Sequence, residues 1–181
     1  MLKNGYPGRN AGLFSPGRTL VLCALLLFTG GCSTLPATVL NNKSHLLSTG
    51  HCEGCDLRQA TFSGLDLKQV HLHGADLSDA RFTDAHLEGA DLSGTNLQNA
   101  NFDGASMIGA NLRGADLRGV NLIDVRLTGA DLRDTDMTDI SSDDELDLMD
   151  LVGVRLDGAR FKDGVTCGGF PKKGGWGCQP E

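Results

Sequence analysis

Large apolar residues occupy every fifth position of this chain from residue 57 to residue 137. The series is Leu57, Phe62, Leu67, Leu72, Leu77, Phe82, Leu87, Leu92, Leu97, Phe102, Met107, Leu112, Leu117, Leu122, Leu127, Leu132 and Met137. The residue two positions before each one is most often alanine. A helix repeats apolar residues every three to four positions and a strand every two, so a period of five fits neither. The pattern predicts a solenoid of short extended pieces joined by turns.

The order of residues within each repeat predicts which side chains face inward. In an extended piece, the large residue and the small residue two before it point inward, and the polar residue between them points outward. The fourth and fifth positions of the repeat make the corner, and Gly, Asp and Asn there tolerate the turn that it requires. Phe62, Phe82 and Phe102 are spaced by twenty residues. We therefore expect them to stack in one column, with twenty residues in each coil.

Five repeats carry the triplet Ala-(Asp/Asn)-Leu, namely those centred on Leu77, Leu92, Leu112, Leu117 and Leu132. In this feature the chain resembles the pentapeptide-repeat family, whose consensus is A-(D/N)-L-x-x, over residues 55–139 and again over 149–163. The resemblance implies an all-β fold, a right-handed quadrilateral β-helix (a pentapeptide-repeat solenoid) of about five coils.

The first 31 residues have the composition of an export signal. Lys3, Arg9 and Arg18 precede an apolar run over residues 20–28, and small residues then lead to Cys32. This arrangement resembles the bacterial lipoprotein processing box, which implies cleavage before Cys32 and a lipid on that cysteine. By the same resemblance, Ser33 favours sorting to the outer membrane. The alternative is an uncleaved membrane anchor, although the apolar run is shorter than the ~20 residues of a membrane span.

These patterns divide the chain into four parts. We predict a lipoprotein signal peptide over residues 1–31, a tether over 32–51, the β-helix over 52–163 and a Gly-rich C-terminal cap over 164–181. An irregular acidic insertion over 140–148 interrupts the β-helix, after which the repeat resumes with its positions shifted by one residue. The insertion is open to three interpretations: a partner-binding loop, a calcium site or an inert bulge.

Four cysteines flank the repeat in two pairs, Cys52 with Cys55 and Cys167 with Cys178. An exported chain reaches a compartment in which disulfides persist. Four cysteines allow three connectivities. We favour the two local pairs, because the pairs lie at opposite ends of the expected solenoid.

The charge of the chain argues against a nucleic-acid partner. The whole chain has 16 basic and 23 acidic residues, a net charge of −7. Removal of residues 1–31 takes away Lys3, Arg9 and Arg18 and no acid, which leaves 13 basic residues and a net charge of −10. Binding through nucleic-acid phosphates is unfavourable for such a surface.

Two outward histidines, His71 and His73, raise a metal-site hypothesis, with Asp91 one coil further on as a third ligand. Two imidazoles alone leave an open and weak site. Exposed polar positions in a permissive repeat account for the same residues more simply. We therefore predict no metal and no cofactor.

The sequence offers no catalytic constellation, because its glycines belong to corners and it lacks a nucleophile elbow, a phosphate loop and paired carboxylates in a cleft. We predict a non-enzymatic structural or protein-interaction module, exported and lipid-anchored at the outer membrane, facing the periplasm. Its expected partners are the membrane, through the lipid on Cys32, and an unidentified envelope protein, with no small-molecule substrate. The alternative is a DNA-mimicking protein that acts on a type II topoisomerase, as some cytoplasmic pentapeptide-repeat proteins do.

Overall fold

The computed structural model describes residues 35–139, 153–161, 165–167 and 178–180 of the chain. The chain divides into two units, Met1–Thr34 and Leu35–Glu181, and every described residue belongs to the second. The expected signal peptide, Cys32 and the insertion over 140–148 therefore lie outside the described residues. Among the helices of the described part, none is long and apolar enough to cross a membrane.

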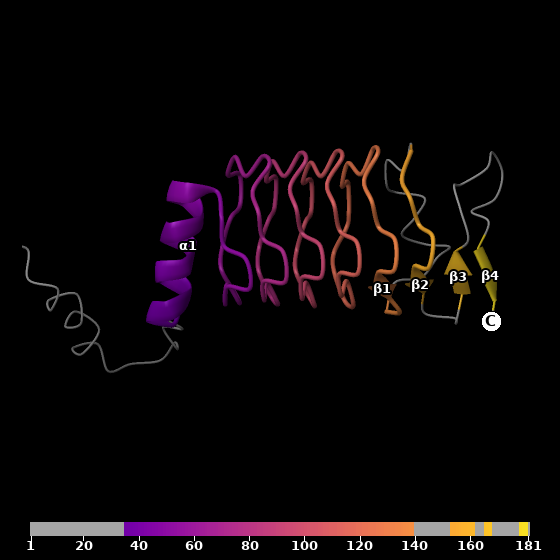
Figure 1. The fold of residues 1–181 in the computed structure, drawn as a ribbon, viewed down its shortest axis with the longest axis horizontal. Helices are drawn as coiled ribbons and strands as arrows, with labels where there is room; N and C mark the ends of the chain where they lie inside the picture. Colours follow the sequence, from indigo (N-terminus) through magenta and orange to yellow (C-terminus); the bar gives the residue numbers. More distant parts are fainter. Residues whose placement is uncertain (1–34, 140–152, 162–164, 168–177, 181) are drawn as a thin grey trace, which may run out of the picture. The chain divides into compact units, whose positions relative to one another are not determined.

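Residues 51–139 form a coil that returns to the same position every twenty residues (Figure 1). Parallel bridges join the outward residue of each repeat to the residue twenty positions later, on four walls. We name the walls by their bridged residues: wall A contains Asp56, Asp76, Asn96, Asp116 and Asp136; wall B contains Thr61, Arg81, Asn101 and Asn121; wall C contains Asp66, His86, Ser106 and Arg126; wall D contains His51, His71, Asp91, Asn111 and Asp131. The expected quadrilateral β-helix is confirmed.

The large central residue of each repeat lies inside the coil. Phe62, Phe82 and Phe102 are fully buried, and their rings stack with 4.9 Å and 4.8 Å between successive centroids. The aromatic column expected from the twenty-residue spacing is therefore confirmed. Burial of one large apolar side chain stabilises a fold by about 1.5–3 kcal/mol. The stacked columns thus supply the main favourable free energy of the coil.

Each corner is a tight turn closed by a backbone hydrogen bond. In one example the Ala60 N–H donates to the Leu57 carbonyl oxygen at 3.1 Å, and Gln59 between them has φ +59°. This left-handed conformation costs a residue with a side chain roughly 1–2 kcal/mol, which glycine avoids. At Gly104 there is a second reason for glycine, because a Cβ there would lie 2.5 Å from Asp84 Oδ1. The corner positions expected from Gly, Asp and Asn are confirmed.

The coil that contains the insertion is four residues longer than the others. Asp131 bridges Arg155, and Asp136 pairs with Arg160, a spacing of 24 residues instead of 20. The Leu132 N–H donates to the Arg155 carbonyl oxygen at 2.8 Å, so the parallel hydrogen bonds resume after the insertion. Four added residues displace a five-residue pattern by the same amount as one removed residue. This explains the one-residue shift in the sequence.

Helix α1 (Ala37–Thr49) precedes the coil, so the prediction of a tether over residues 32–51 is wrong for this part. Gly50 ends the helix in a left-handed conformation, and its N–H donates to the Leu46 carbonyl oxygen. Val39 and Leu46 are 1% exposed and belong to the same apolar core as the coil. They lie two turns apart on one helix face. The helix forms here because this face covers the apolar end of the first coil, which a tether would leave in water.

Two short strands follow the coil at its C-terminal end. The sheet order is β1 (Asp136–Met137), β2 (Arg160–Phe161), β3 (Val165–Cys167) and β4 (Cys178–Pro180). β1 and β2 are parallel, as within the coil, whereas β3 is antiparallel to both β2 and β4. Part of the expected cap over 164–181 therefore forms strands on the last coil, and the rest of it lies outside the described residues.

A disulfide joins Cys52 and Cys55 at the first corner of the coil. Cys52 is 2% exposed and takes the central inward position of its repeat, where other repeats have leucine or phenylalanine. The bond thus holds covalently a corner that elsewhere depends on a hydrogen bond. Cys167 and Cys178 occupy opposite backbone positions on β3 and β4. Their disulfide stays a prediction.

Candidate functional site

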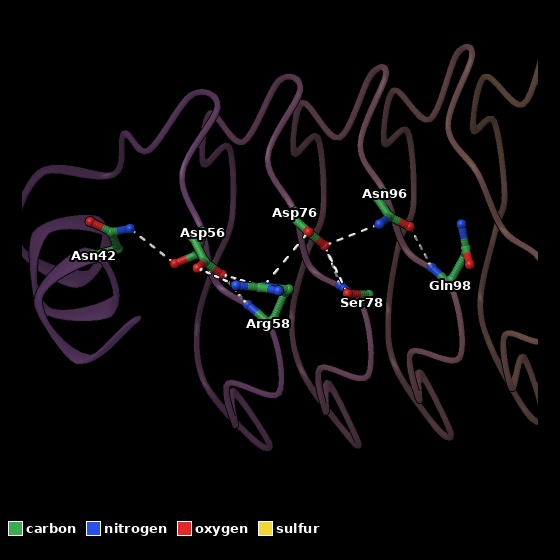
Figure 2. Close-up of polar contacts among 7 residues, drawn as sticks. All are labelled: Asn42, Asp56, Arg58, Asp76, Ser78, Asn96 and Gln98. Atoms are coloured by element: carbon green, nitrogen blue, oxygen red, sulfur yellow. Dashed lines mark hydrogen bonds and ion pairs between the residues drawn. The ribbon is translucent and has the colours of Figure 1, made fainter. Parts of the chain in front are cut away.

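Wall A carries a series of polar contacts that runs from α1 along the coil (Figure 2). Arg58 donates to both carboxylate oxygens of Asp56 at 2.9 Å, and its Nε lies 3.8 Å from Asp76 Oδ2 in the next coil. Asp76 Oδ1 accepts hydrogen bonds from the Ser78 hydroxyl at 2.8 Å and from Asn96 Nδ2 at 3.1 Å. The outward side chains therefore connect successive coils as well as meeting solvent.

Outward Asp and Asn residues also bind their own turns. Asp76 Oδ1 accepts from the Ser78 N–H at 3.1 Å, and Asn101 Oδ1 accepts from the Asp103 N–H at 2.9 Å. The same bond occurs at Asp56, Asp66, Asp91, Asn96, Asn111, Asp116, Asn121, Asp131 and Asp136. Side-chain bonds of this kind stabilise turns. Much of the outward polarity therefore has a structural role.

Arginines two residues after an aspartate neutralise carboxylates on walls A and D. Arg118 binds Asp116, and Arg133 binds Asp131, each through two nitrogens. The hydrogen bonds from Arg118 and from Arg133 lower the pKa of Asp116 and of Asp131, respectively, against the opposing effect of burial. Ion pairs at a surface stabilise by only ~0–1 kcal/mol. Their larger consequence is that these walls present both charges and not a uniformly acidic surface.

The first coil presents backbone carbonyl oxygens that no earlier coil can pair. Within the coil, such an oxygen on an outward residue accepts a hydrogen bond from an N–H of the preceding coil. At the first coil, Asn42 Nδ2 donates to the Asp56 carbonyl oxygen at 2.9 Å, and Lys43 Nζ donates to the Thr61 carbonyl oxygen. Lys43 Nζ also lies 5.4 Å from the centroid of the Phe62 ring. Side chains of α1 thus replace the missing backbone donors on walls A and B.

In the first two coils, wall D carries the bridged residues His51 and His71. Glu53 and His73 follow them by two residues, and each lies on the other side of the inward residue between. His51 and His71 are bridged residues of adjacent coils, and their rings stack with 4.5 Å between centroids. Glu53 Oε1 lies 3.1 Å from His51 Nδ1, and this contact lowers the pKa of Glu53. The ligand atoms of His51, Glu53 and His71 all lie within 4.8 Å of one another. His73 instead contacts the Ser93 hydroxyl of the next coil at 2.9 Å.

Asp91, the third member of the metal-site hypothesis, has other partners. Its Oδ1 accepts hydrogen bonds from the hydroxyl and the N–H of Ser93 and from Asn111 Nδ2. Burial raises the pKa of Asp91, but the hydrogen bonds from Ser93 and the nearby His73 and His71 together lower it more, so the net pKa is lowered. Of His71, His73 and Asp91, only His71 belongs to a converging group of ligand atoms in the described residues.

The family model for pentapeptide repeats matches residues 51–89, 80–119 and 100–139, with eight copies of the repeat. The repeat region of this chain belongs to the pentapeptide-repeat family. This match indicates no enzyme family. No curated protein matches the chain at a significant level.

Solved structures of pentapeptide-repeat proteins also match this one. The protein alr5209 from Nostoc PCC 7120 is 28% identical, with a TM-score of 0.52, and the match covers 68% of this chain and 95% of alr5209. HetL from Nostoc sp. strain PCC 7120, involved in heterocyst differentiation regulation, is 34% identical, with a TM-score of 0.47, over 64% of this chain and 51% of HetL. This chain therefore spans about half the length of HetL.

A third similar structure is a trypsin-treated form of QnrB1, a plasmid-mediated fluoroquinolone resistance protein. It is 21% identical, with a TM-score of 0.31, over 61% of this chain and 72% of QnrB1. The match to alr5209 supports the fold of this pentapeptide-repeat protein as a right-handed quadrilateral β-helix.

The metal-site hypothesis does not include His51 and Glu53, although the twenty-residue coil of this pentapeptide-repeat protein brings both close to His71. That hypothesis pairs His71 with Asp91, which follows it by twenty residues. Applied backward from His71, the same spacing gives His51. Glu53 then follows as the outward residue on the other side of the buried Cys52. The signal for the observed group was therefore present in the sequence.

Proposed function

We propose that this pentapeptide-repeat protein is exported, is anchored by a lipid on Cys32, and acts by binding other proteins at the cell envelope and not by catalysis. The coil then faces the periplasm from the outer membrane. The observation that carries the proposal is the sequence of residues 1–31, in which basic residues, an apolar run and small residues lead to Cys32. Only residues 33–36 separate Cys32 from the first residue of the capping helix α1.

This short connection limits how far the coil stands from the membrane. An extended chain advances at most about 3.3–3.6 Å per residue, so the Cα atoms of Cys32 and Ala37 are at most about 18 Å apart. α1 packs on the coil through Val39 and Leu46. A lipid on Cys32 therefore holds the first coils close to the bilayer, and the walls beyond them are presented to an envelope protein.

The outward walls suit binding better than catalysis. Central residues such as Leu97 are buried, and outward carboxylates such as Asp116 are engaged by turns and arginines. Repeat proteins use extended surfaces of this kind to bind partners, because the regular scaffold holds many side chains in fixed positions. A regular wall of mixed charge supports a docking role for the same reason.

Cell fractionation of the wild-type and Cys32→Ser proteins tests the anchor. We expect the wild type in the outer-membrane fraction and labelled by palmitate fed to the cells, because the Cys32 thiol is the acceptor. Cys32→Ser should be unlabelled and absent from that fraction. Cys23→Ser, which changes the other cysteine of the N-terminal region, is the matched control and should behave as the wild type. A soluble, unlabelled wild type would refute the proposal.

The alternative function, mimicry of DNA for a type II topoisomerase, depends on the negative charge of the chain. The pairs Arg118–Asp116 and Arg133–Asp131 weigh against it, since they neutralise carboxylates that a phosphate-like surface needs. A DNA supercoiling assay with purified gyrase and the purified chain distinguishes the two functions. We expect no inhibition, and inhibition at equimolar protein would favour mimicry.

A further inference from the structure

We propose that His51, Glu53 and His71 bind one zinc ion on wall D, at the N-terminal end of the coil. The proposal concerns a surface that is independent of the anchor, so it stands or falls separately from the proposed function. It depends on three observations: which ligand atoms converge, how the backbone holds them, and how the neighbouring histidine differs.

The three side chains offer a suitable donor set at a suitable separation. Two imidazoles and one carboxylate, with water in the fourth position, are a ligand set that zinc accepts. The ligand atoms lie within 4.8 Å of one another. Tetrahedral zinc with bonds of about 2.0–2.1 Å needs ligand atoms about 3.4 Å apart. The side chains of His51 and Glu53 are about half exposed, so they are free to rotate over the remaining distance.

The backbone of the site is fixed before any ion binds. His51 and His71 are joined by a parallel bridge, and the Cys52 N–H donates to the His71 carbonyl oxygen at 2.8 Å. Glu53 lies between Cys52 and Cys55, on the corner that the disulfide closes. The three ligands therefore come from two adjacent coils whose separation is set by the β-helix. Little backbone entropy is lost when the ion binds.

His73 provides an internal comparison on the same wall. It follows His71 by two residues, but its Nδ1 lies 2.9 Å from the Ser93 hydroxyl oxygen. That hydroxyl donates to Asp91 Oδ1, so it accepts a hydrogen bond from the His73 ring. His73 is thus directed to the next coil, away from the group of His51, Glu53 and His71. His73 is therefore a histidine close to His71 on the same wall, but it does not belong to the site.

Isothermal titration calorimetry of the purified full chain in detergent with zinc chloride tests the proposal. Free thiols are first alkylated without reduction, so that cysteines cannot bind the ion and the Cys52–Cys55 disulfide stays intact. We expect one equivalent of zinc to bind the wild type. His71→Ala and Glu53→Gln should bind at least ~10-fold more weakly, since each loses one of three ligands. His73→Ala, the matched control, should bind within ~2-fold of the wild type.

Thermal denaturation with and without zinc gives a second readout that controls for misfolding. Without zinc, His71→Ala should melt within a few degrees of the wild type, because the exposed ring adds little to the fold. With zinc, the melting temperature of the wild type and of His73→Ala should rise, because the ion binds only the folded coil. That of His71→Ala should rise much less at the same zinc concentration, because its zinc binding is weaker. The proposal is wrong if the wild type binds no zinc up to ~1 mM, or if His71→Ala binds as tightly as the wild type.

Discussion

The N-terminal end of the coil is covered by a helix, whereas the C-terminal end continues into antiparallel strands. At the first end, α1 buries Val39 and Leu46 against the core, and its Asn42 and Lys43 donate to carbonyl oxygens of the first coil. At the other end, β3 pairs with β2, and β4 pairs with β3. Side chains therefore pair the edge at one end, and main-chain groups pair it at the other.

This difference shows that the end of a solenoid has two separate requirements: its apolar core must be covered, and its strand edges must be paired. A helix covers the core well, but its own backbone groups are already used within the helix, so only side chains can reach the edge. A strand pairs the edge directly. The N-terminal end should therefore respond to single side-chain changes, and the C-terminal end to changes that release its strands.

We expect the largest effect from Leu46→Ala. Leu46 is 1% exposed under α1, and removal of such a side chain costs about 2–5 kcal/mol. The loss should appear as faster hydrogen exchange at the Phe62 amide and not at the Leu117 amide, because only the first coils lose their cover. Leu47→Ala is the control, since Leu47 is 50% exposed. Equal effects of the two changes would contradict the role given to α1.

At the other end, Cys178→Ser should release β4. The opposite backbone positions of Cys167 and Cys178 favour a disulfide, and its loss costs up to ~3 kcal/mol for a loop of this length. Hydrogen exchange over β3 (Val165–Cys167) should accelerate in the variant, with no change at the Phe62 amide. Mass spectrometry of the non-reduced wild type should find the two cysteines in one linked peptide pair. Full alkylation of both thiols in the folded, oxidised protein would exclude the bond.

A smaller effect is expected from Asn42→Ala, which leaves the Asp56 carbonyl oxygen without its donor from α1. A hydrogen bond of this kind contributes about 0.5–1.5 kcal/mol. Asn41→Ala is a matched control, because its exposed side chain is one residue away and both changes alter helix propensity equally. The difference between the two variants in hydrogen exchange at the Leu57 amide measures the bond. No difference would mean that the edge does not need this donor.

The smallest expected effect is the loss of stability from the ion pairs near the two ends of the coil as the pH falls. The pKa of Asp131 and that of Asp56 are both lowered, chiefly by hydrogen bonds from Arg133 and Arg58. A carboxyl whose pKa is lowered by folding adds stability above its unfolded pKa of about 3.9, and that stability is lost as the pH falls through the folded pKa. The melting temperature should therefore be nearly constant from about pH 7 to 5 and fall below about pH 4.

Substitution of each arginine shows how much of that stability comes from the ion pair at each end. Arg133 is 25% exposed and Arg58 is 55% exposed, so solvent screens the Arg58 pair more strongly. Arg133→Gln should therefore lower the melting temperature at pH 7 more than Arg58→Gln does, and both decreases should be small. The difference should shrink at pH 3. The opposite order would show that exposure does not decide the strength of these pairs.

The sequence by itself determined the regular part of this protein. The period of five predicts a coil, the twenty-residue spacing of Phe62, Phe82 and Phe102 predicts its circumference, and Gly, Asp and Asn predict its corners. The physical reason is that each repeat packs on a near copy of itself one coil away. A local pattern repeated many times therefore contains its own long-range contacts.

Only the tertiary structure decided what happens at the ends of the coil, where the chain has no repeat. Residues 37–49 contain two adjacent asparagines and no repeat, and they form α1 because the first coil supplies an apolar surface and unpaired oxygens. Asn42 and Lys43 reach the Asp56 and Thr61 carbonyl oxygens only because α1 lies on the first coil. An end has no copy of itself to pack against, so its structure depends on contacts that occur once and leave no periodic trace in the chain.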